Sequence, residues 1–256
     1  MKTKTVYYEN ELEDEFSKAK ITPKKIDGSY DYNLSSSADR FKRYILQGIA
    51  KPLSLICVKL RFSRKIVGKE KLKPYKSLGI FLYGNHTQTV FDAINPSTLV
   101  FPKTAYTVVS SENVSIKILG SITPYLGALP IPDTTGAYRN FRAAIKQKID
   151  EGGAVIIYPE AHIWPYHTGI RSFSDTPFYY PAKLGAPAFT FTNTYQKSPI
   201  GVKITTYIDG PFFPDMTLSL RARAKCLRDK VFDTMTERAK SSTLTLIEYV
   251  KREGSL

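Results

Sequence analysis

Two segments of the sequence carry side chains that could do acid–base chemistry. In the first, an apolar run at 79–83 is followed by His86 and, six positions later, by Asp92. A carboxylate that holds one imidazole nitrogen stabilises the imidazolium and leaves the other nitrogen free to take a proton. No G-x-S-x-G elbow, P-loop or H-E-x-x-H motif accompanies the pair. The pair therefore favours general-base activation of a substrate hydroxyl, although a histidine near an aspartate is more often structural.

The second segment places another carboxylate after an apolar run. Residues 154–158 are followed by Pro159 and Glu160, and then by His162 and His167. Because chemistry in α/β proteins gathers at the carboxyl ends of strands, Glu160 is expected at the same sheet edge as His86. The two histidines and Glu160 could in principle ligate a metal, but their spacing fits no standard site. We therefore expect no metal, and the alternative for both histidines is a polar loop residue.

The elements that must position these residues alternate along the chain. A length of 256 residues suits one compact domain with an ample core. Strand and helix patterns follow one another from residue 78 onward, which predicts an α/β fold with a mixed, partly parallel sheet flanked by helices. The expected strands are 79–83, 105–109, 154–158, 188–192 and 202–208, and the expected helices are 138–149 and 220–235.

The excess of positive charge is concentrated in one short segment. The net charge of the chain is +14. Residues 41–76 hold eleven basic side chains and one acidic one, whereas residues 1–40 hold seven and eight and residues 77–256 hold nineteen and fourteen. Such a block favours a polyanionic partner: a nucleic acid, an anionic bilayer or an acidic protein.

Apolar residues inside the basic block recur at helical spacing. They are Phe41, Ile45, Ile49, Leu53, Ile56 and Leu60. Because proline ends one helix and can begin the next, Pro52 predicts two amphipathic helices near 39–50 and 52–62. Such a basic hairpin is typical of a segment that lies in the headgroup layer of an anionic membrane. The alternative is a helix pair packed on the domain's own core; nucleic acid is disfavoured because the interleaved residues are aliphatic.

These patterns divide the chain into three parts. We expect a polar extension with little core of its own at 1–38, basic amphipathic membrane-contacting helices at 39–76 and an α/β domain at 77–256. No apolar run approaches the roughly 20 residues of a spanning helix, and the first ten residues do not resemble a secretory signal. Two cysteines do not make a disulfide framework. We therefore expect a peripheral protein on the cytoplasmic face of a membrane.

Taken together, residues 40–210 resemble the lysophospholipid acyltransferase family, typified by 1-acylglycerol-3-phosphate acyltransferase. Asn85-His86 with Asp92 resembles the family's His–Asp motif, and Tyr158-Pro159-Glu160 resembles its aromatic-Pro-Glu motif. Residues 126–132 occupy the place of its second block, and residues 185–188 sit where the family has a Pro-containing strand start. The order of four blocks is more specific than any one alone, and the basic lead-in matches how some members bind the bilayer.

The departures from the family pattern concern spacing and cations. The family usually has four residues between His and Asp, whereas this chain has the five residues 87–91. Asp133 falls where the second block often has Arg, and residues 161–163 replace the family's Gly-Thr-Arg. In the family those cations are thought to hold the acceptor's phosphate. Candidate substitutes, each with an ordinary surface arginine as its alternative, are Arg139, Arg142 and Arg171.

The resemblance implies a single glycerolphosphate-acyltransferase-like domain that moves a fatty acyl group from acyl-CoA or acyl carrier protein to a hydroxyl of a lysophospholipid or related glycerolipid. His86 would be the general base and Asp92 its partner, without cofactor, metal or nucleic acid. Backbone donors near Glu160 would be candidates for stabilising the oxyanion. The substrate-binding candidates are Asn85, Thr87, Gln88, Tyr158, Glu160, His162, Arg139 and Arg171. Alternatives are a non-catalytic peripheral membrane protein of the same fold, a nucleic-acid-binding domain and a thioesterase.

Overall fold

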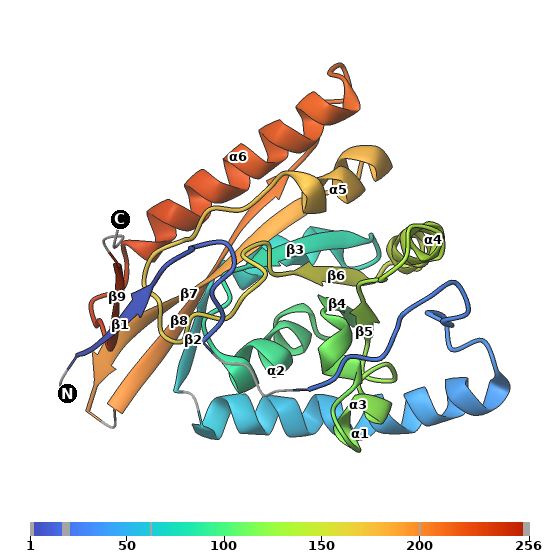
Figure 1. Cartoon of the computed structure of the whole chain (residues 1–256), viewed down its shortest axis with the longest axis horizontal. Helices are drawn as coiled ribbons and strands as arrows, with labels where there is room; N and C mark the ends of the chain where they lie inside the picture. The colour runs from blue at the N-terminus through green and yellow to red at the C-terminus, as the bar shows by residue number, and fades with distance from the viewer. Residues whose placement is uncertain (1–2, 17–20, 62, 200, 253–256) are drawn as a thin grey trace.

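A seven-stranded sheet forms the centre of the computed structural model, which describes residues 3–16, 21–61, 63–199 and 201–252. Its strand order is β2-β8-β7-β3-β6-β4-β5 (Figure 1). β7 and β8 pair antiparallel, and the other neighbours pair parallel. The strands are β2 (Arg64–Val67), β3 (Ile80–Gly84), β4 (Ala105–Val109), β5 (Ala128–Pro130), β6 (Ala154–Ile157), β7 (Ala188–Ser198) and β8 (Gly201–Phe212). The predicted mixed, partly parallel sheet is confirmed.

Helices cover both faces of this sheet. On one face lie α4 (Ala137–Asp150), α5 (Tyr179–Leu184) and α6 (Leu220–Ala239), and on the other lie α2 (Thr89–Val100) and the end of α1 (Ser37–Arg61) (Figure 1). Side chains of β3 alternate between the two faces. Phe81 and Tyr83 join the core beneath α4 and α6, and Ile80 and Leu82 join the core beneath α2. The central strand must therefore be apolar along its whole length.

The hydrophobic pattern predicts some elements of the structure and misses others. The strands β4 and β6 and the helix α4 lie where the sequence predicts them, within one or two residues. β7 and β8 continue beyond their predicted ends because they form an antiparallel ribbon whose far part carries polar side chains. The short elements β5 and α3 (Leu119–Ile122) and the buried helix α2 are not predicted. Short 3₁₀ helices lie at Lys69–Tyr75, Ser111–Val114 and Thr176–Phe178.

The basic segment forms one helix, so the predicted pair of helices divided at Pro52 is wrong. α1 runs without a break from Ser37 to Arg61. A proline inside a helix removes the hydrogen bond to the carbonyl four residues earlier, which belongs here to Gly48. Pro52 and Gly48 are both exposed, and space around the Gly48 Cα is open. The unpaired carbonyl can therefore be hydrated, and the helix continues.

The apolar stripe of α1 faces solvent. Phe41 is 67% exposed and Ile49 is 62% exposed, and Leu53 and Ile56 are similarly open. The helix instead packs through the opposite side, where Val58 is buried. The alternative in which the stripe packs on the domain's own core does not hold for these residues; the Leu60 side chain lies outside the described part. Among the described residues, no helix is both long and apolar enough to cross a membrane.

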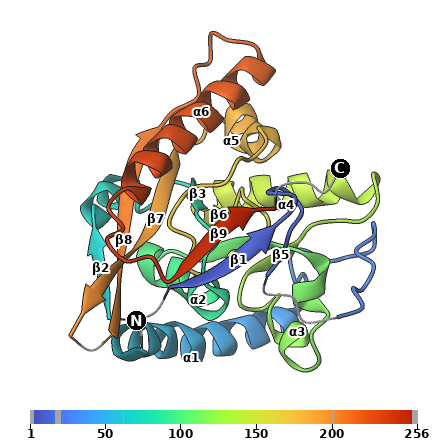
Figure 2. The ribbon, with the colours of Figure 1, turned by 60° about the vertical axis from the view of Figure 1, so that its left-hand side comes forward.

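The polar extension packs against the α/β body. Its strand β1 (Lys4–Tyr8) pairs in parallel with β9 (Ile247–Lys251), the strand that follows α6 (Figure 2). Ile26 and Tyr32 are buried in the core beneath α4. Residues 17–20 of the predicted extension lie outside the described part. The sheet also begins before the predicted boundary at residue 77, because β2 pairs with β8.

Candidate active site

The loop after β3 brings His86 and Asp92 into contact. His86 lies two residues beyond the end of β3, and Asp92 lies in the first turn of α2. The Nδ1 atom of His86 is 3.0 Å from Oδ2 of Asp92. The same oxygen accepts the backbone N–H groups of Thr87 and Gln88, each at 2.8 Å. The five intervening residues therefore fit because a tight turn folds around the carboxylate.

The carboxylate of Asp92 is buried and surrounded by donors. It is 1% exposed, and its other oxygen lies 3.4 Å from Nδ2 of Asn193. Because Asp92 accepts the proton on Nδ1 of His86, the lone pair of the neutral ring is on Nε2. Within the described part of the chain, no group bonds to Nε2, and the His86 side chain is 18% exposed. The geometry suits a general base.

Tyr158 fixes the plane of the His86 ring. The two rings stack with their centroids 4.2 Å apart and their planes 19° from parallel. The Tyr158 hydroxyl donates to the backbone carbonyl of Asp92 at 2.6 Å. Burial, with a smaller contribution from the Asp92 charge, raises the pKa of Tyr158 well above its ordinary value. Tyr158 therefore stays protonated and acts here as a positioning residue.

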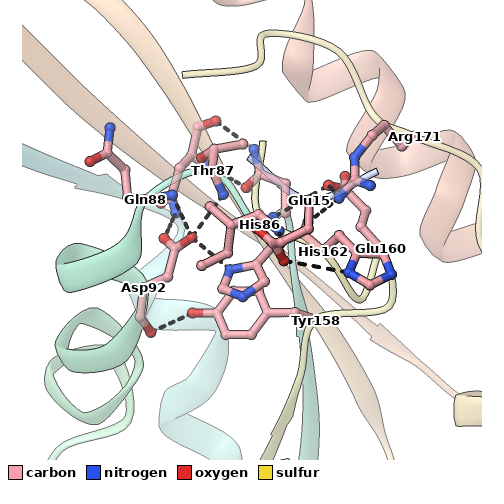
Figure 3. A network of polar contacts seen from close by, with 12 residues as sticks. Glu15, His86, Thr87, Gln88, Asp92, Tyr158, Glu160, His162 and Arg171 are labelled. Atoms are coloured by element: carbon pink, nitrogen blue, oxygen red, sulfur yellow. Dashed lines mark hydrogen bonds and ion pairs between the residues drawn. The ribbon is translucent and has the colours of Figure 1, made fainter. Parts of the chain in front are cut away.

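Glu160 and Arg171 form a buried ion pair beside His86 (Figure 3). Nη2 of Arg171 is 3.1 Å from Oε2 of Glu160, which also accepts the His86 backbone N–H at 3.5 Å. Burial raises the pKa of Glu160, against the lowering effect of the Arg171 charge. Arg171 is 1% exposed. Arg171 thus reaches the site, but its buried guanidinium is held by protein groups and positions Glu160.

The loop after β6, residues 158–171, is joined to the His86 loop by backbone hydrogen bonds. Trp164 N–H donates to the His86 carbonyl at 3.1 Å, and Tyr166 N–H donates to the Thr87 carbonyl at 3.0 Å. Two backbone N–H groups near Glu160, where oxyanion donors are expected, already donate to carbonyls of the protein. The N–H groups of Ala161 and His162 bond to carbonyls of the same loop, at 3.1 and 2.8 Å.

Residues of the N-terminal extension hold this second loop from outside. Glu15 lies 3.4 Å from Nδ1 of His162 and accepts the Ile163 N–H at 3.2 Å (Figure 3). The Trp164 indole donates to the Asp14 carbonyl at 2.8 Å, and Nη1 of Arg171 donates to the Glu11 carbonyl at 3.2 Å. These contacts are not predictable from the sequence, because about 150 residues separate the partners and no local pattern marks them.

β9 closes the other side of Trp164. The Trp164 and Tyr249 rings stack with centroids 4.7 Å apart, and the Arg171 guanidinium lies 4.8 Å from the indole ring. Trp164 is 1% exposed. The loop that carries Glu160 therefore depends on the segment that follows β1 and on β9, near the two ends of the described chain.

Three of the other predicted binding residues contact β7 and not an open site. Asn85 and Thr87 are buried and bond to β7: Asn85 exchanges hydrogen bonds with the Asn193 backbone, and the Thr87 hydroxyl is 2.6 Å from the Tyr195 hydroxyl. The Gln88 amide also approaches Tyr195, at 3.5 Å. These three residues fasten the His86 loop to the sheet.

The two candidate arginines on α4 lie apart from the His86 network. Arg139 and Arg142 are exposed, and no hydrogen bond or ion pair among the described residues joins either to His86, Asp92 or Glu160. Over the same residues, no group of three or more His, Cys, Asp or Glu side chains is arranged to hold a metal.

The chain is similar to a known protein in structure, although no sequence comparison finds a match. No protein-family model and no curated protein matches the sequence. The crystal structure of PlsC from Thermotoga maritima, a 1-acyl-sn-glycerophosphate (LPA) acyltransferase, is similar to this chain with a TM-score of 0.56. The similarity covers 83% of this chain and 87% of that chain, at 19% sequence identity. The resemblance drawn from the sequence is thus confirmed at the level of architecture: the chain has the fold of the 1-acyl-sn-glycerophosphate acyltransferase PlsC.

Proposed function

We propose that the protein is an acyltransferase that moves a fatty acyl group from a thioester to a hydroxyl of a lysophospholipid or related glycerolipid. The observation that carries the proposal is the 3.0 Å contact between His86 and Asp92 at the carboxyl end of β3. The fold shared with PlsC supports the same reaction class. The donor is acyl-CoA or acyl carrier protein, and the reaction needs no cofactor.

In the proposed mechanism, His86 is the group that carries the proton. Nε2 of His86 takes the proton from the acceptor hydroxyl as the oxygen attacks the thioester carbonyl. When the carbon–sulfur bond breaks, the imidazolium returns that proton to the departing thiolate. Asp92 stabilises the cation in between, and Tyr158 holds the ring plane. General-base help of this kind contributes about 10²–10⁴-fold, so positioning and charge stabilisation must supply the rest.

We propose that the protein works as a peripheral protein at the cytoplasmic face of an anionic membrane. The exposed stripe of α1 supports this, because a buried apolar face would have no area left to bind lipid. Basic side chains beside the stripe, such as Lys42, are suited to anionic headgroups. Salt should detach the protein from anionic vesicles, and indifference to salt and lipid charge would contradict the proposal.

The test of the reaction is a mass-resolved transfer assay with anionic vesicles. Acyl-CoA and acyl carrier protein are offered against 1-acylglycerol 3-phosphate and uncharged lyso-acceptors, with His86→Ala alongside. We expect a diacyl product from the native protein and a loss of at least about 10²-fold in the variant. Circular dichroism and thermal unfolding confirm that the variant is folded.

Three results would contradict this proposal. Near-normal turnover by folded His86→Ala protein refutes the mechanism. Free fatty acid as the sole product indicates a thioesterase. Vesicle binding without any change in lipid composition, with every donor and acceptor, indicates a non-catalytic peripheral protein of the same fold.

A further inference from the structure

A basic pocket lies where α1 ends and β2 begins. Its volume is about 640 Å³. Lys59 comes from α1, Arg64 and Lys65 from β2, and Lys203 from β8; Leu55 and Ser63 complete the lining. None of these residues is acidic. The pocket is distinct from the His86 network, and the proposed mechanism does not use it.

Within the described part of the chain, no acidic side chain forms an ion pair with the four cations of this pocket. Arg64 donates to the side chains of Asn95 and Thr98 on α2, and both partners are uncharged. Burial lowers the pKa of Arg64 to about 10, so the guanidinium stays charged at neutral pH. Across the described residues, no ion pair involves Lys59, Lys65 or Lys203. Arg64 and Lys203 are partly buried, and Lys59 and Lys65 are exposed beside them. Cations clustered in this way without acidic partners favour a multiply charged anion.

Strand register places the pocket at the same sheet edge as His86. Arg64 pairs with Ile204, which pairs with Tyr195, and the Tyr195 hydroxyl contacts Thr87 in the His86 loop. β7 and β8 separate β2 from β3. Three strand spacings of about 4.8 Å put the two strands about 14 Å apart.

We propose that this pocket binds phosphate groups of the acyl donor, which holds its acyl chain on a phosphopantetheine arm. The inference rests on the proposed function, because it needs the thioester at His86. In acyl-CoA the pantetheine arm separates the thioester sulfur from the first phosphate. That arm is about as long as four residues of extended chain, roughly 15 Å. That length matches the separation of about 14 Å between the strands that carry the pocket and the His86 loop. The CoA phosphates also bring negative charge to the four cations.

The same distance argues against the acceptor as the ligand. In 1-acylglycerol 3-phosphate the phosphate is bound to the carbon next to the one that bears the reacting hydroxyl. An acceptor hydroxyl at His86 thus keeps its phosphate within a few bonds of the reaction, far short of the pocket. A bilayer headgroup is the competing ligand, since α1 borders the pocket, and the experiment separates the two.

The experiment measures binding of CoA to the full chain by titration calorimetry, without lipid. The double variant Lys65→Glu, Lys203→Glu reverses two pocket charges whose side chains make no ion pair in the described structure. The double variant Lys183→Glu, Lys230→Glu, at exposed positions of α5 and α6, is the control matched in charge. We expect at least about tenfold weaker binding in the double variant, a shallower salt dependence, and no change in the control. Pantetheine, which lacks phosphate, should bind the double variant and the native protein equally.

Turnover and vesicle binding complete the test. With acyl-CoA or acyl carrier protein as donor, the double variant should raise the donor KM and leave the acceptor KM unchanged. Equal CoA affinity in the native protein and the double variant overturns the proposal, even where native turnover confirms acyl transfer. Weakened binding to anionic vesicles with unchanged CoA affinity also overturns it and assigns the pocket to a headgroup. If the native protein binds CoA through the pocket but makes no product, the proposed function fails, and the pocket stands as a CoA-phosphate site without a role in acyl transfer.

Discussion

The two loops that form the candidate site are held in different ways. The His86 loop is fixed by its own neighbours, because Asp92 bonds to three groups within six residues of itself. The loop after β6 is fixed from a distance, by Glu11–Glu15 on one side and by Tyr249 on the other. One loop therefore carries its conformation in its local sequence, whereas the other acquires it when the whole chain has folded.

This difference separates His86 and Asp92 from the neighbouring residues Glu160 and His162. The base and its partner lie on the self-contained loop, so damage elsewhere should leave their contact intact. Glu160 and His162 lie on the dependent loop, so their placement should follow the state of β1 and β9. Substitutions in the two loops should thus give different combinations of lost stability and lost rate.

The largest effect is expected at Trp164, where the dependent loop meets both of its supports. Trp164→Ala should lower the free energy of unfolding by about 3–5 kcal/mol, because a fully buried indole is removed. Urea unfolding measures this loss, and Trp164→Phe should lose less. We expect the hydrogen-bonded Nδ1 proton of His86 to give a downfield NMR signal in the native protein and in the folded variant. Its disappearance would show that the two loops are one unit.

A change inside the self-contained loop should act on rate more than on stability. Asp92→Asn keeps an acceptor for the N–H groups of Thr87 and Gln88 but removes the charge that stabilises the imidazolium. We expect kcat to fall by about 10²-fold with a small change in KM. Steady-state kinetics measures both constants, and Asp229→Asn on the surface of α6 is the control. An unchanged kcat would mean that the contact at His86 is only structural.

A smaller effect is expected from pH, and it should belong to the dependent loop. Burial, aided by the Arg171 charge, lowers the pKa of His167 to about 4. The unfolded chain binds this proton near pH 6.5, so the unfolded state takes up more protons as pH falls. The stability contributed by neutral His167 should therefore be lost as pH falls from about 6.5 to about 4.

His167→Gln isolates that contribution from those of other groups. Between pH 7 and pH 5, the native protein should lose about 1–2 kcal/mol more than the variant does. Urea unfolding at the two pH values measures the difference. Equal losses in the two proteins would place the titrating group elsewhere.

The contrast between the loops also explains what the sequence could predict. His86 and Asp92 follow one apolar run that predicts a buried strand, and Glu160 follows a second run that ends at Tyr158. Strands that end at one sheet edge bring their loops together. The contact between His86 and Asp92 across five residues depends on a turn that no pattern specifies. The contributions of Glu11 and Tyr249 depend on pairing between β1 and β9, which are about 240 residues apart. Such pairing leaves no periodic signal in either segment.

The basic helix shows the limit of a local rule. Pro52 predicts a break, and the structure has none, because exposure lets water satisfy the carbonyl of Gly48. The apolar stripe itself was predictable, since its spacing is helical. Which side of α1 faces the protein could not be predicted, because packing through Val58 depends on the distant residues Tyr195 and Ile204.

The pairing of β1 with β9 has a consequence for the order in which the protein becomes competent during synthesis. A nascent chain that ends before residue 247 already contains both loops and the His86–Asp92 pair. It lacks Tyr249 and the partner strand of β1, so the support around Trp164 is missing on that side. Growing chains should thus acquire the base early and the ordered Glu160 loop late, and ribosome-bound intermediates should expose Trp164 until β9 has emerged.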